Sequence, residues 1–368
     1  MGGLLKDIYS RTFYNGLTDV VASVSSSFAK QKFLQFIFDA DWQSMELKER
    51  MRHTSLALHQ FLPGNFESKV KIITEIIHKL RKKGVKDMSF EYMFLPDYIE
   101  TYGIDHYDIS VKAIGFVTQF TSCEFAVRPF LIKYGDKMMR QMLQWSQHEN
   151  HKVRRLASEG ARPRLPWAIA VPSLKKDPTP VLPVLENLKN DPSEFVRRSV
   201  ANNLNDISKD HPAIVTSIAH RWKGISKETD AIIRHGCRTL LKQADTGMLR
   251  YFGIAHNTAI KVSGFKINSP SVKIGNSLGF SFTVKNTDEK RHIVRLEYAV
   301  YYRKHNGQLS RKVFKISERP YRTKEKCLIE RKQSFKNITT RRFYPGKHKL
   351  AVIINGKELK AGQFVLVK

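Results

Sequence analysis

One short stretch of the sequence places a carboxylate among arginines. "RRLASEGARPRLPW", residues 154–167, contains Glu159 and four arginines, and two prolines close it. A carboxylate in such a setting is either half of a structural ion pair or a group that stabilises a developing positive charge and assists an attacking water. Spacing alone favours the ion pair, because Arg155 lies four residues before Glu159 on a predicted helix.

The helix that carries Glu159 is one of three with the same pattern. "VRRLASEGAR", "VRRSVANNLN" and "IRHGCRTLLK" begin at Val153, Val196 and Ile233, and their second residues are 43 and 37 positions apart. This spacing is typical of HEAT-type helical repeats. At 100° per residue each helix has one apolar face, which we expect in the core. The residues of these faces are Val153, Ala157 and Ala161, then Val196, Val200 and Leu204, then Ile233, Cys237 and Leu241.

The opposite faces are polar, and stacked repeats align such faces into a continuous concave surface. They carry Arg155, Glu159 and Arg162, then Arg198, Asn202 and Asn205, then His235, Thr239 and Lys242. We therefore expect one basic groove with Glu159 inside it. A carboxylate there would repel an anionic ligand, a cost that a surface ion pair does not explain. The residues predicted to bind DNA phosphates are Arg154, Arg155, Arg162, Arg197, Arg198, His235 and Lys242.

The hydrophobic period changes near residue 254 and divides the chain into two predicted domains. Residues 1–254 show helical periodicity, whereas later segments such as "HIVRLEYAVYYR" alternate with a period of two. "LAVIINGKELKAGQFVLV" reads as a hairpin that turns at Asn355 and Gly356. About seven short strands predict an immunoglobulin-like β-sandwich over 255–368. The predicted fold class is thus an N-terminal α-solenoid of HEAT-like repeats followed by this sandwich.

The composition indicates a polyanionic partner. The chain of 368 residues has a net charge of +29, and residues 255–368 alone hold 26 Lys and Arg against 7 Asp and Glu. Nucleic acid is such a partner, and the β domain is the stronger candidate for its electrostatic binding, the alternative being a merely solvated basic surface. No apolar run is long enough to span a membrane, the 3 cysteines are scattered, and no histidine spacing or glycine-rich loop predicts a metal or nucleotide site. We expect a cytoplasmic protein without cofactor or metal.

Several long motifs resemble a known family. "EFAVRPF" (124–130), "VRRLASEGARPRLPWA" (153–168) and "VRRSVANNLNDISKDHP" (196–212) are similar to the AlkC branch of the HEAT-like DNA alkylation-repair glycosylases, relatives of AlkD. "ELKERMRH" and "MFLPDYIETYG" extend the resemblance over most of residues 1–254. The β domain fits members of this branch that append an immunoglobulin-like module.

The resemblance implies a monofunctional glycosylase that removes cationic alkylated bases from duplex DNA, chiefly 3-methyladenine and also 3-methylcytosine. It implies that Glu159, Asp206 and Glu124 are the carboxylates near the lesion and that Trp167 contacts the deoxyribose, with Arg155 beside them. A cationic base already weakens its glycosidic bond, so carboxylates that stabilise an oxocarbenium-like sugar and position water suffice. No lysine nucleophile is required. The implied partner is alkylated double-stranded DNA, bound by a monomer associated with the bacterial nucleoid during repair.

Each of these residues also has a purely structural interpretation. Without the resemblance, Asp206 is a capping or ion-pair residue, Trp167 is a core anchor between repeats, and Glu124 pairs with Arg128 four residues on. The alternative function for the whole chain is a non-catalytic HEAT scaffold that binds nucleic acid or an acidic partner. A third hypothesis gives the basic β domain an RNA-binding role.

Overall fold

The structure, a computed structural model, describes residues 4–254, 259–337 and 342–368. Its contacts divide the chain into two compact units, Met1–Gly236 and Cys237–Lys368. The boundary predicted at 254/255 adjoins residues 255–258, which lie outside the described residues, and it stays a prediction.

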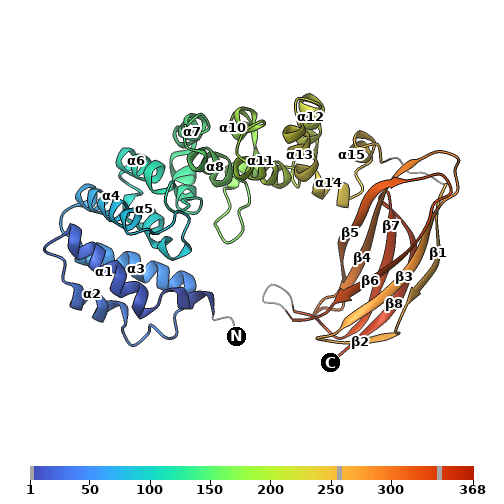
Figure 1. Cartoon of the computed structure of the whole chain (residues 1–368), viewed down its shortest axis with the longest axis horizontal. Coiled ribbons are helices and arrows are strands. Elements are labelled where there is room, and N and C mark those ends of the chain that lie inside the picture. Colours follow the sequence, from blue (N-terminus) through green and yellow to red (C-terminus); the bar gives the residue numbers. More distant parts are fainter. Residues whose placement is uncertain (1–3, 255–258, 338–341) are drawn as a thin grey trace. The chain divides into compact units, whose positions relative to one another are not determined.

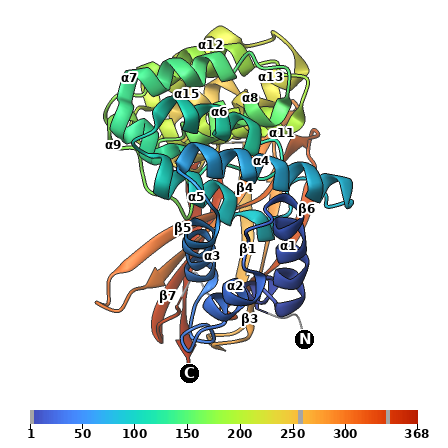
Figure 2. The ribbon, with the colours of Figure 1, turned by 90° about the vertical axis from the view of Figure 1, so that its left-hand side faces the viewer.

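The described part of the first unit is helical. Helices follow one another in chain order along the unit (Figure 1), and Figure 2 views them with α1, α2 and α3 in the foreground. The helices are η1 (Leu5–Ile8), α1 (Arg11–Val24), α2 (Lys30–Ile37), α3 (Leu47–Phe61), α4 (Phe66–Lys82), η2 (Phe90–Tyr92), α5 (Phe94–Gly103), α6 (Tyr107–Val117), α7 (Val127–Trp145), α8 (His151–Gly160), α9 (Pro172–Lys176), η3 (Thr179–Val181), α10 (Leu182–Leu188), α11 (Glu194–Ile207), α12 (Pro212–Trp222) and α13 (Lys227–Gly236).

The apolar faces predicted for the repeat helices form the core. Val153 and Ala157 of α8 and Val196 and Val200 of α11 are fully buried, and α8 packs on both α7 and α11. Buried polar contacts join α8 and α11 as well, because the Asn203 side chain donates to a carbonyl of α8 at 2.8 Å. These contacts fix α8, which carries Glu159, between its two neighbours.

The second residue of each of the first two repeat helices ties the helix to the loop before it. Arg154 and Arg197 each donate from Nη1 to the backbone carbonyls five and six residues earlier, at 2.7 to 2.9 Å. Arg154 also binds both carboxylate oxygens of Asp191, at 2.6 and 3.1 Å. Such multidentate contacts to a buried carboxylate and to carbonyls hold a guanidinium in one place. The structure therefore gives these two predicted phosphate ligands a structural role.

The third repeat differs from the prediction of one continuous helix from Ile233. The helix α13 ends at Gly236, and α14 (Arg238–Lys242) begins after Cys237. Gly236 approaches α11 so closely that a Cβ there would lie 3.0 Å from the Cβ of Leu204, which explains a residue of low helix propensity at this point. Lys242 thus belongs to the second unit and His235 to the first.

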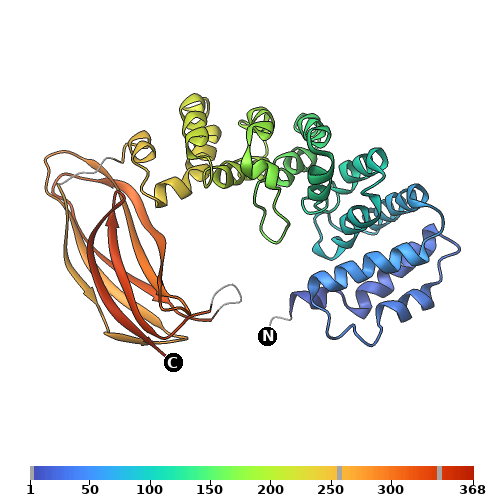
Figure 3. The ribbon, with the colours of Figure 1, turned by 180° about the vertical axis from the view of Figure 1, so that it is seen from behind.

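The second unit consists of α14, α15 (Thr246–Tyr251) and two sheets (Figure 3). One sheet has the strand order β1-β3-β6 and the other β2-β8-β7-β4-β5. The strands are β1 (Ile260–Ile267), β2 (Ser271–Lys273), β3 (Ser277–Asn286), β4 (His292–Arg303), β5 (Leu309–Tyr321), β6 (Lys326–Ser334), β7 (Gly346–Ile354) and β8 (Lys357–Val367). All pairings are antiparallel except that of β2 with β8.

The sandwich core follows the predicted alternation. The inward residues of β4, from Val294 to Tyr302, pack with those of β3, β7 and β8 in one apolar cluster. Asn355 and Gly356 both have positive φ, 48° and 82°, as the predicted hairpin turn requires. Of the strands in the described residues, only the three-residue β2 was not predicted from the sequence. Among the described residues no helix is long and apolar enough to cross a membrane.

Candidate active site

Glu159 lies in the last turn of α8. The helix begins at the cap residue Asn150, whose side chain accepts from the Lys152 amide, and its apolar face packs inward. At its end Gly160 lies against α7, where a Cβ would come within 2.5 Å of a methyl group of Val127. This close packing buries Glu159, which is 5% exposed.

The three predicted carboxylates lie along one line of alternating charges, here called the ionic chain. It runs from Glu124 through Arg155, Glu159 and Arg162 to Asp206. Arg155 Nη1 lies 2.6 Å from Glu124 Oε2, Arg162 Nη1 lies 2.6 Å from Glu159 Oε1, and Arg162 Nε lies 2.8 Å from Asp206 Oδ2. The link between Arg155 and Glu159 is longer, 3.9 Å. The structure therefore brings together the three carboxylates and Arg155, which the resemblance places near the lesion. Asp206 comes from the next repeat.

The pair expected between Arg155 and Glu159 is present as the longer contact of 3.9 Å, but both side chains are largely buried and not on an exposed surface. The main partner of Glu159 is Arg162, and the two side chains are 6% and 8% exposed. Burial by itself lowers the pKa of the Arg162 guanidinium. The neighbouring carboxylates of Glu159 and Asp206 have the larger effect, so this pKa lies above its ordinary value. Arg162 therefore fixes two carboxylates, and the expectation of a phosphate contact from it is corrected.

Two carboxylates of the ionic chain keep an oxygen free. Glu124 uses Oε2 for Arg155 and for the Ser122 hydroxyl, and Glu159 uses Oε1 for Arg162. Their other oxygens have no hydrogen bond to a described residue. Asp206 instead uses both oxygens, because Lys209 Nζ binds Oδ1 at 2.7 Å. Glu124 and Glu159 can thus accept from water or face a positive charge while an arginine fixes their orientation.

The loop after α8 carries Trp167 and extends away from the row of helices (Figures 1 and 3). Trp167 is 64% exposed, so the core-anchor interpretation is wrong. Its φ is 67°, a conformation that a bulky residue seldom adopts. The Lys48 ammonium of α3 donates to the Trp167 carbonyl. The indole is thus presented to solvent from a fixed backbone.

A buried arginine fixes the same loop. Arg128 of α7 is fully buried and donates to the carbonyls of Gly160 and Arg162, at 2.9 and 2.8 Å, and to that of Ile169. Burial, together with the charge of Arg162, lowers the pKa of Arg128 to about 10. The predicted pair of Glu124 with Arg128 is therefore wrong, because Arg128 is occupied by the loop. Sequence reasoning missed this role, although an arginine within the apolar "EFAVRPF" was the available signal.

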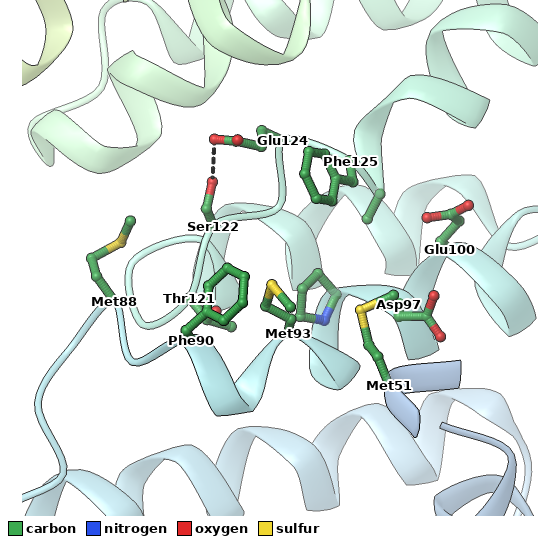
Figure 4. Close-up of a pocket in the computed structure, with 12 residues that line it drawn as sticks. Met51, Met88, Phe90, Met93, Asp97, Glu100, Thr121, Ser122, Glu124 and Phe125 are labelled. Atoms are coloured by element: carbon green, nitrogen blue, oxygen red, sulfur yellow. Dashed lines mark hydrogen bonds between the residues drawn. The ribbon is translucent and has the colours of Figure 1, made fainter. Parts of the chain in front are cut away.

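A cavity beside Glu124 contains a second acidic pair (Figure 4). It holds about 110 Å³, three methionines and two phenylalanines are among its lining residues, and the lining includes Asp97 and Glu100 of α5. Arg52 Nη2 lies 2.9 Å from Asp97 Oδ1. Burial and the charge of Asp97 raise the pKa of Glu100 to about 7, and burial also raises the pKa of Asp97. The same two carboxylates line a neighbouring cavity of about 430 Å³ that includes Trp167. The sequence reading assigned them no role.

Of the remaining predicted phosphate ligands, Arg155 is 14% exposed and bound to Glu124, whereas the other three are exposed. Arg198 and His235 are exposed and line a groove of about 410 Å³ between α11 and α13, together with Lys227. Arg155 stacks its guanidinium 4.3 Å from the ring centre of Phe195. Lys242 is exposed on the second unit. Within residues 4–254, 259–337 and 342–368 no group of three metal-binding side chains occurs.

Comparisons with known proteins bear on both units. A model of the family described as DNA alkylation repair enzyme matches residues 111–237. A model described as the C-terminal Ig-like domain of the uncharacterised protein YhaZ matches residues 261–368. The first match contains the whole ionic chain, and the second covers the β-sandwich.

A solved structure matches the entire chain. It is the alkylpurine DNA glycosylase AlkC of Pseudomonas fluorescens bound to DNA with an abasic site analog, 32% identical, with both chains fully covered and a TM-score of 0.92. The chain belongs to the AlkC family. Protein YhaZ of Bacillus subtilis strain 168 is similar over 96% of both chains, at 44% identity. This membership confirms the predicted fold class of a helical-repeat region followed by an immunoglobulin-like domain, and it confirms the resemblance.

Proposed function

We propose that this AlkC-family protein is a monofunctional DNA glycosylase that hydrolyses the N-glycosidic bond of cationic alkylated bases in double-stranded DNA. The ionic chain is the observation that carries the proposal. It holds three carboxylates at fixed positions and leaves oxygens of Glu124 and Glu159 free. Family membership directs the chemistry toward alkylated DNA. Within that class we name 3-methyladenine, and also 3-methylcytosine, as substrates.

The chemistry needs little more than this arrangement. A base that carries a positive charge leaves without prior protonation, so the barrier lies in the charge that develops on the sugar. A free oxygen of Glu159 stabilises that charge and accepts a proton from the attacking water. Trp167 adds an aromatic face, which contributes about 1 kcal/mol or more against a desolvated cation. Asp206, whose oxygens are both occupied, acts in this proposal by holding Arg162 and thereby the orientation of Glu159.

The ionic chain also reconciles a carboxylate site with an anionic ligand. Glu124, Glu159 and Asp206 carry three negative charges, and Arg155, Arg162 and Lys209 carry three positive ones. The cluster as a whole is neutral, so phosphates in the adjacent groove meet little net repulsion. Arg198, His235 and Lys242 remain the proposed phosphate contacts. We carry forward the predictions of a cytoplasmic monomer without metal or cofactor as part of this proposal.

The test is release of free methylated bases from duplex DNA treated with a methylating agent. Glu159→Gln should lose release while its DNA occupancy is unchanged, because the amide keeps the shape and removes the charge. Glu186→Gln, a partly exposed glutamate of α10 that pairs with Lys189, is the matched control and should release bases like the unmodified protein. Binding without any base release by the unmodified protein would instead support a non-catalytic scaffold, for which Glu159→Gln should preserve or improve every activity.

A further inference from the structure

An aromatic side chain covers one guanidinium of the ionic chain. Phe195 is the second residue of α11, and its ring centre lies 4.3 Å from Cζ of Arg155. The ring is 38% exposed, whereas the Arg155 side chain beneath it is only 14% exposed. A guanidinium over the face of a ring is attracted to it, and the attraction grows as the pair is withdrawn from water. Phe195 therefore both shields Arg155 from solvent and attracts it.

The packing of the repeats does not require an aromatic residue at this position. In the other two repeat helices the residues that align with Phe195 are Lys152 and Ile232. Ile232 is 2% exposed and belongs to the core, whereas Phe195 leaves much of its ring in solvent. A partly exposed ring gains less from hydrophobic burial than a core residue does. Core packing thus does not explain the ring, whereas the contact with Arg155 does.

The turn that presents Phe195 is fastened to α8. Asp191, just before α11, accepts from the Arg154 guanidinium at 2.6 and 3.1 Å and from the Ser193 amide at 2.8 Å. Arg154 and Arg155 are neighbours on α8. The first arginine therefore fixes the start of α11, and the second packs on the ring that the start of α11 carries.

The position of Arg155 matters because it lies between two carboxylates. Its Nη1 is 2.6 Å from Glu124 Oε2, and its Nη2 is 3.9 Å from Glu159 Oε1. A small shift of the guanidinium would close the longer contact and place a second arginine directly against Glu159. That shift would withdraw negative charge from the carboxylate that faces the sugar in the proposed chemistry. A ring stacked on the guanidinium opposes the shift, because a planar group on an aromatic face has few favourable orientations.

We infer that Phe195 is a positioning residue for base release. Its ring holds the Arg155 guanidinium at Glu124 and prevents it from closing on Glu159. The inference rests on the proposed glycosylase function and adds to it a residue that the proposal does not use. Phe195 acts through Arg155 and touches neither the base nor the sugar.

The experiment measures single-turnover release of methylated bases from methylating-agent-treated duplex by variants of the full chain. Phe195→Leu keeps an apolar side chain but removes the ring, and it should slow release by about fivefold, the factor that corresponds to one lost cation–π contact. Phe195→Tyr keeps the ring and should release bases like the unmodified protein. The matched control is Tyr107→Leu, which removes a ring 3.8 Å from the Lys137 ammonium, outside the ionic chain, and should not slow release.

Two further measurements separate positioning from other roles of the ring. The affinity of Phe195→Leu for a lesion-free duplex, measured by fluorescence anisotropy, should equal that of the unmodified protein. In the Arg155→Met background, Phe195→Leu should slow release no further, because the ring then has no guanidinium to hold.

Three results would overturn the inference: equal slowing by Phe195→Tyr and Phe195→Leu, losses that multiply in the double variant, or weaker DNA binding at an unchanged rate of release. The last would show that the exposed ring contacts DNA instead of positioning Arg155. If the unmodified protein releases no base, the proposed function fails by itself, and the melting temperatures of the two single variants and the double variant still test the contact. A double variant that loses less than the sum of the single losses would support it, and strictly additive losses would refute it.

Discussion

We predict that Arg162→Met lowers the stability of the first unit, because the Arg162 guanidinium holds two buried carboxylates of the ionic chain. The sequence predicts a phosphate contact, whereas the structure places the guanidinium between Glu159 and Asp206 with 8% of the side chain exposed. Removing one partner of a buried ion pair costs roughly 3–5 kcal/mol. In Arg162→Met each carboxylate keeps a second, weaker partner, Lys209 for Asp206 and the more distant Arg155 for Glu159. We therefore expect Arg162→Met to lower the free energy of unfolding by about 3 kcal/mol, the lower end of that range.

That loss can be measured on the first unit alone. All 4 tryptophans of the chain, at positions 42, 145, 167 and 222, lie in this unit, so tryptophan fluorescence follows its unfolding without a signal from the β-sandwich. For a unit of this size 1 kcal/mol corresponds to about 2–4 °C, so the melting temperature should fall by about 6–12 °C. Arg164→Met is the control: its pair with Asp210 is about one-third exposed and should cost about 1 kcal/mol or less.

Two further measurements sharpen this test. The double variant Arg162→Met/Glu159→Gln should lose less stability than the two single variants together, with a coupling energy of about 1–3 kcal/mol. The salt slope of DNA binding should not change in Arg162→Met, because the side chain contacts no phosphate in this reasoning. Two results together would refute this role of Arg162: a melting temperature of Arg162→Met within about 2 °C of the unmodified protein, and a salt slope of its DNA binding reduced by about 1. They would support the phosphate contact predicted from the sequence.

Three more predictions concern the neighbours of the ionic chain. The pKa of Glu100 is raised to about 7 by burial and by Asp97, so the folded protein binds this proton more tightly than the unfolded chain does, and stability falls as pH rises from about 4.5 to 7. Glu100→Gln should remove this pH dependence and raise the free energy of unfolding by up to about 3 kcal/mol at pH 8, measured by urea unfolding at a series of pH values. The same dependence of the free energy of unfolding on pH in both proteins would contradict this prediction. Trp167→Gly should leave stability unchanged or raise it by up to about 1 kcal/mol, because glycine accepts the positive φ of 67°, while base release falls; a destabilised variant would mean that the indole supports the fold. Arg128→Lys should cost about 3 kcal/mol and speed proteolytic cleavage within residues 161–171, because one ammonium cannot bind the carbonyls that the guanidinium holds; cleavage at the unmodified rate would separate Arg128 from the loop.

The hydrophobic periodicity of the sequence predicts the helices and strands, but it does not predict which side chains pair at the site. The apolar faces of α8 and α11 and the turn at Asn355 follow from local spacing, which is a property of each helix or hairpin by itself. Glu159 is a local partner of Arg162, three residues before it, but the second partner of Arg162 and the partners of Arg128 are residues that only folding brings near. Asp206 lies 44 positions after Arg162, and the Ile169 carbonyl lies 41 positions after Arg128. Local spacing therefore offered closer but incorrect partners, such as Arg128 for Glu124.

The arrangement of the repeats explains why this region tolerates buried charge. Arg154 and Arg197 occupy the same position in successive repeats and fasten each helix to its preceding loop through backbone carbonyls. Arg154 also binds Asp191, and Asn203 of α11 donates to a carbonyl of α8, so the two repeats are fixed to each other and Arg162 on one meets Asp206 on the next. A preorganised ion pair loses less side-chain entropy when it forms than a flexible one, since its geometry is already fixed by the helices. The repeat thus provides a rigid frame in which Glu159 can keep a charge, and an unshared oxygen, within a closely packed unit.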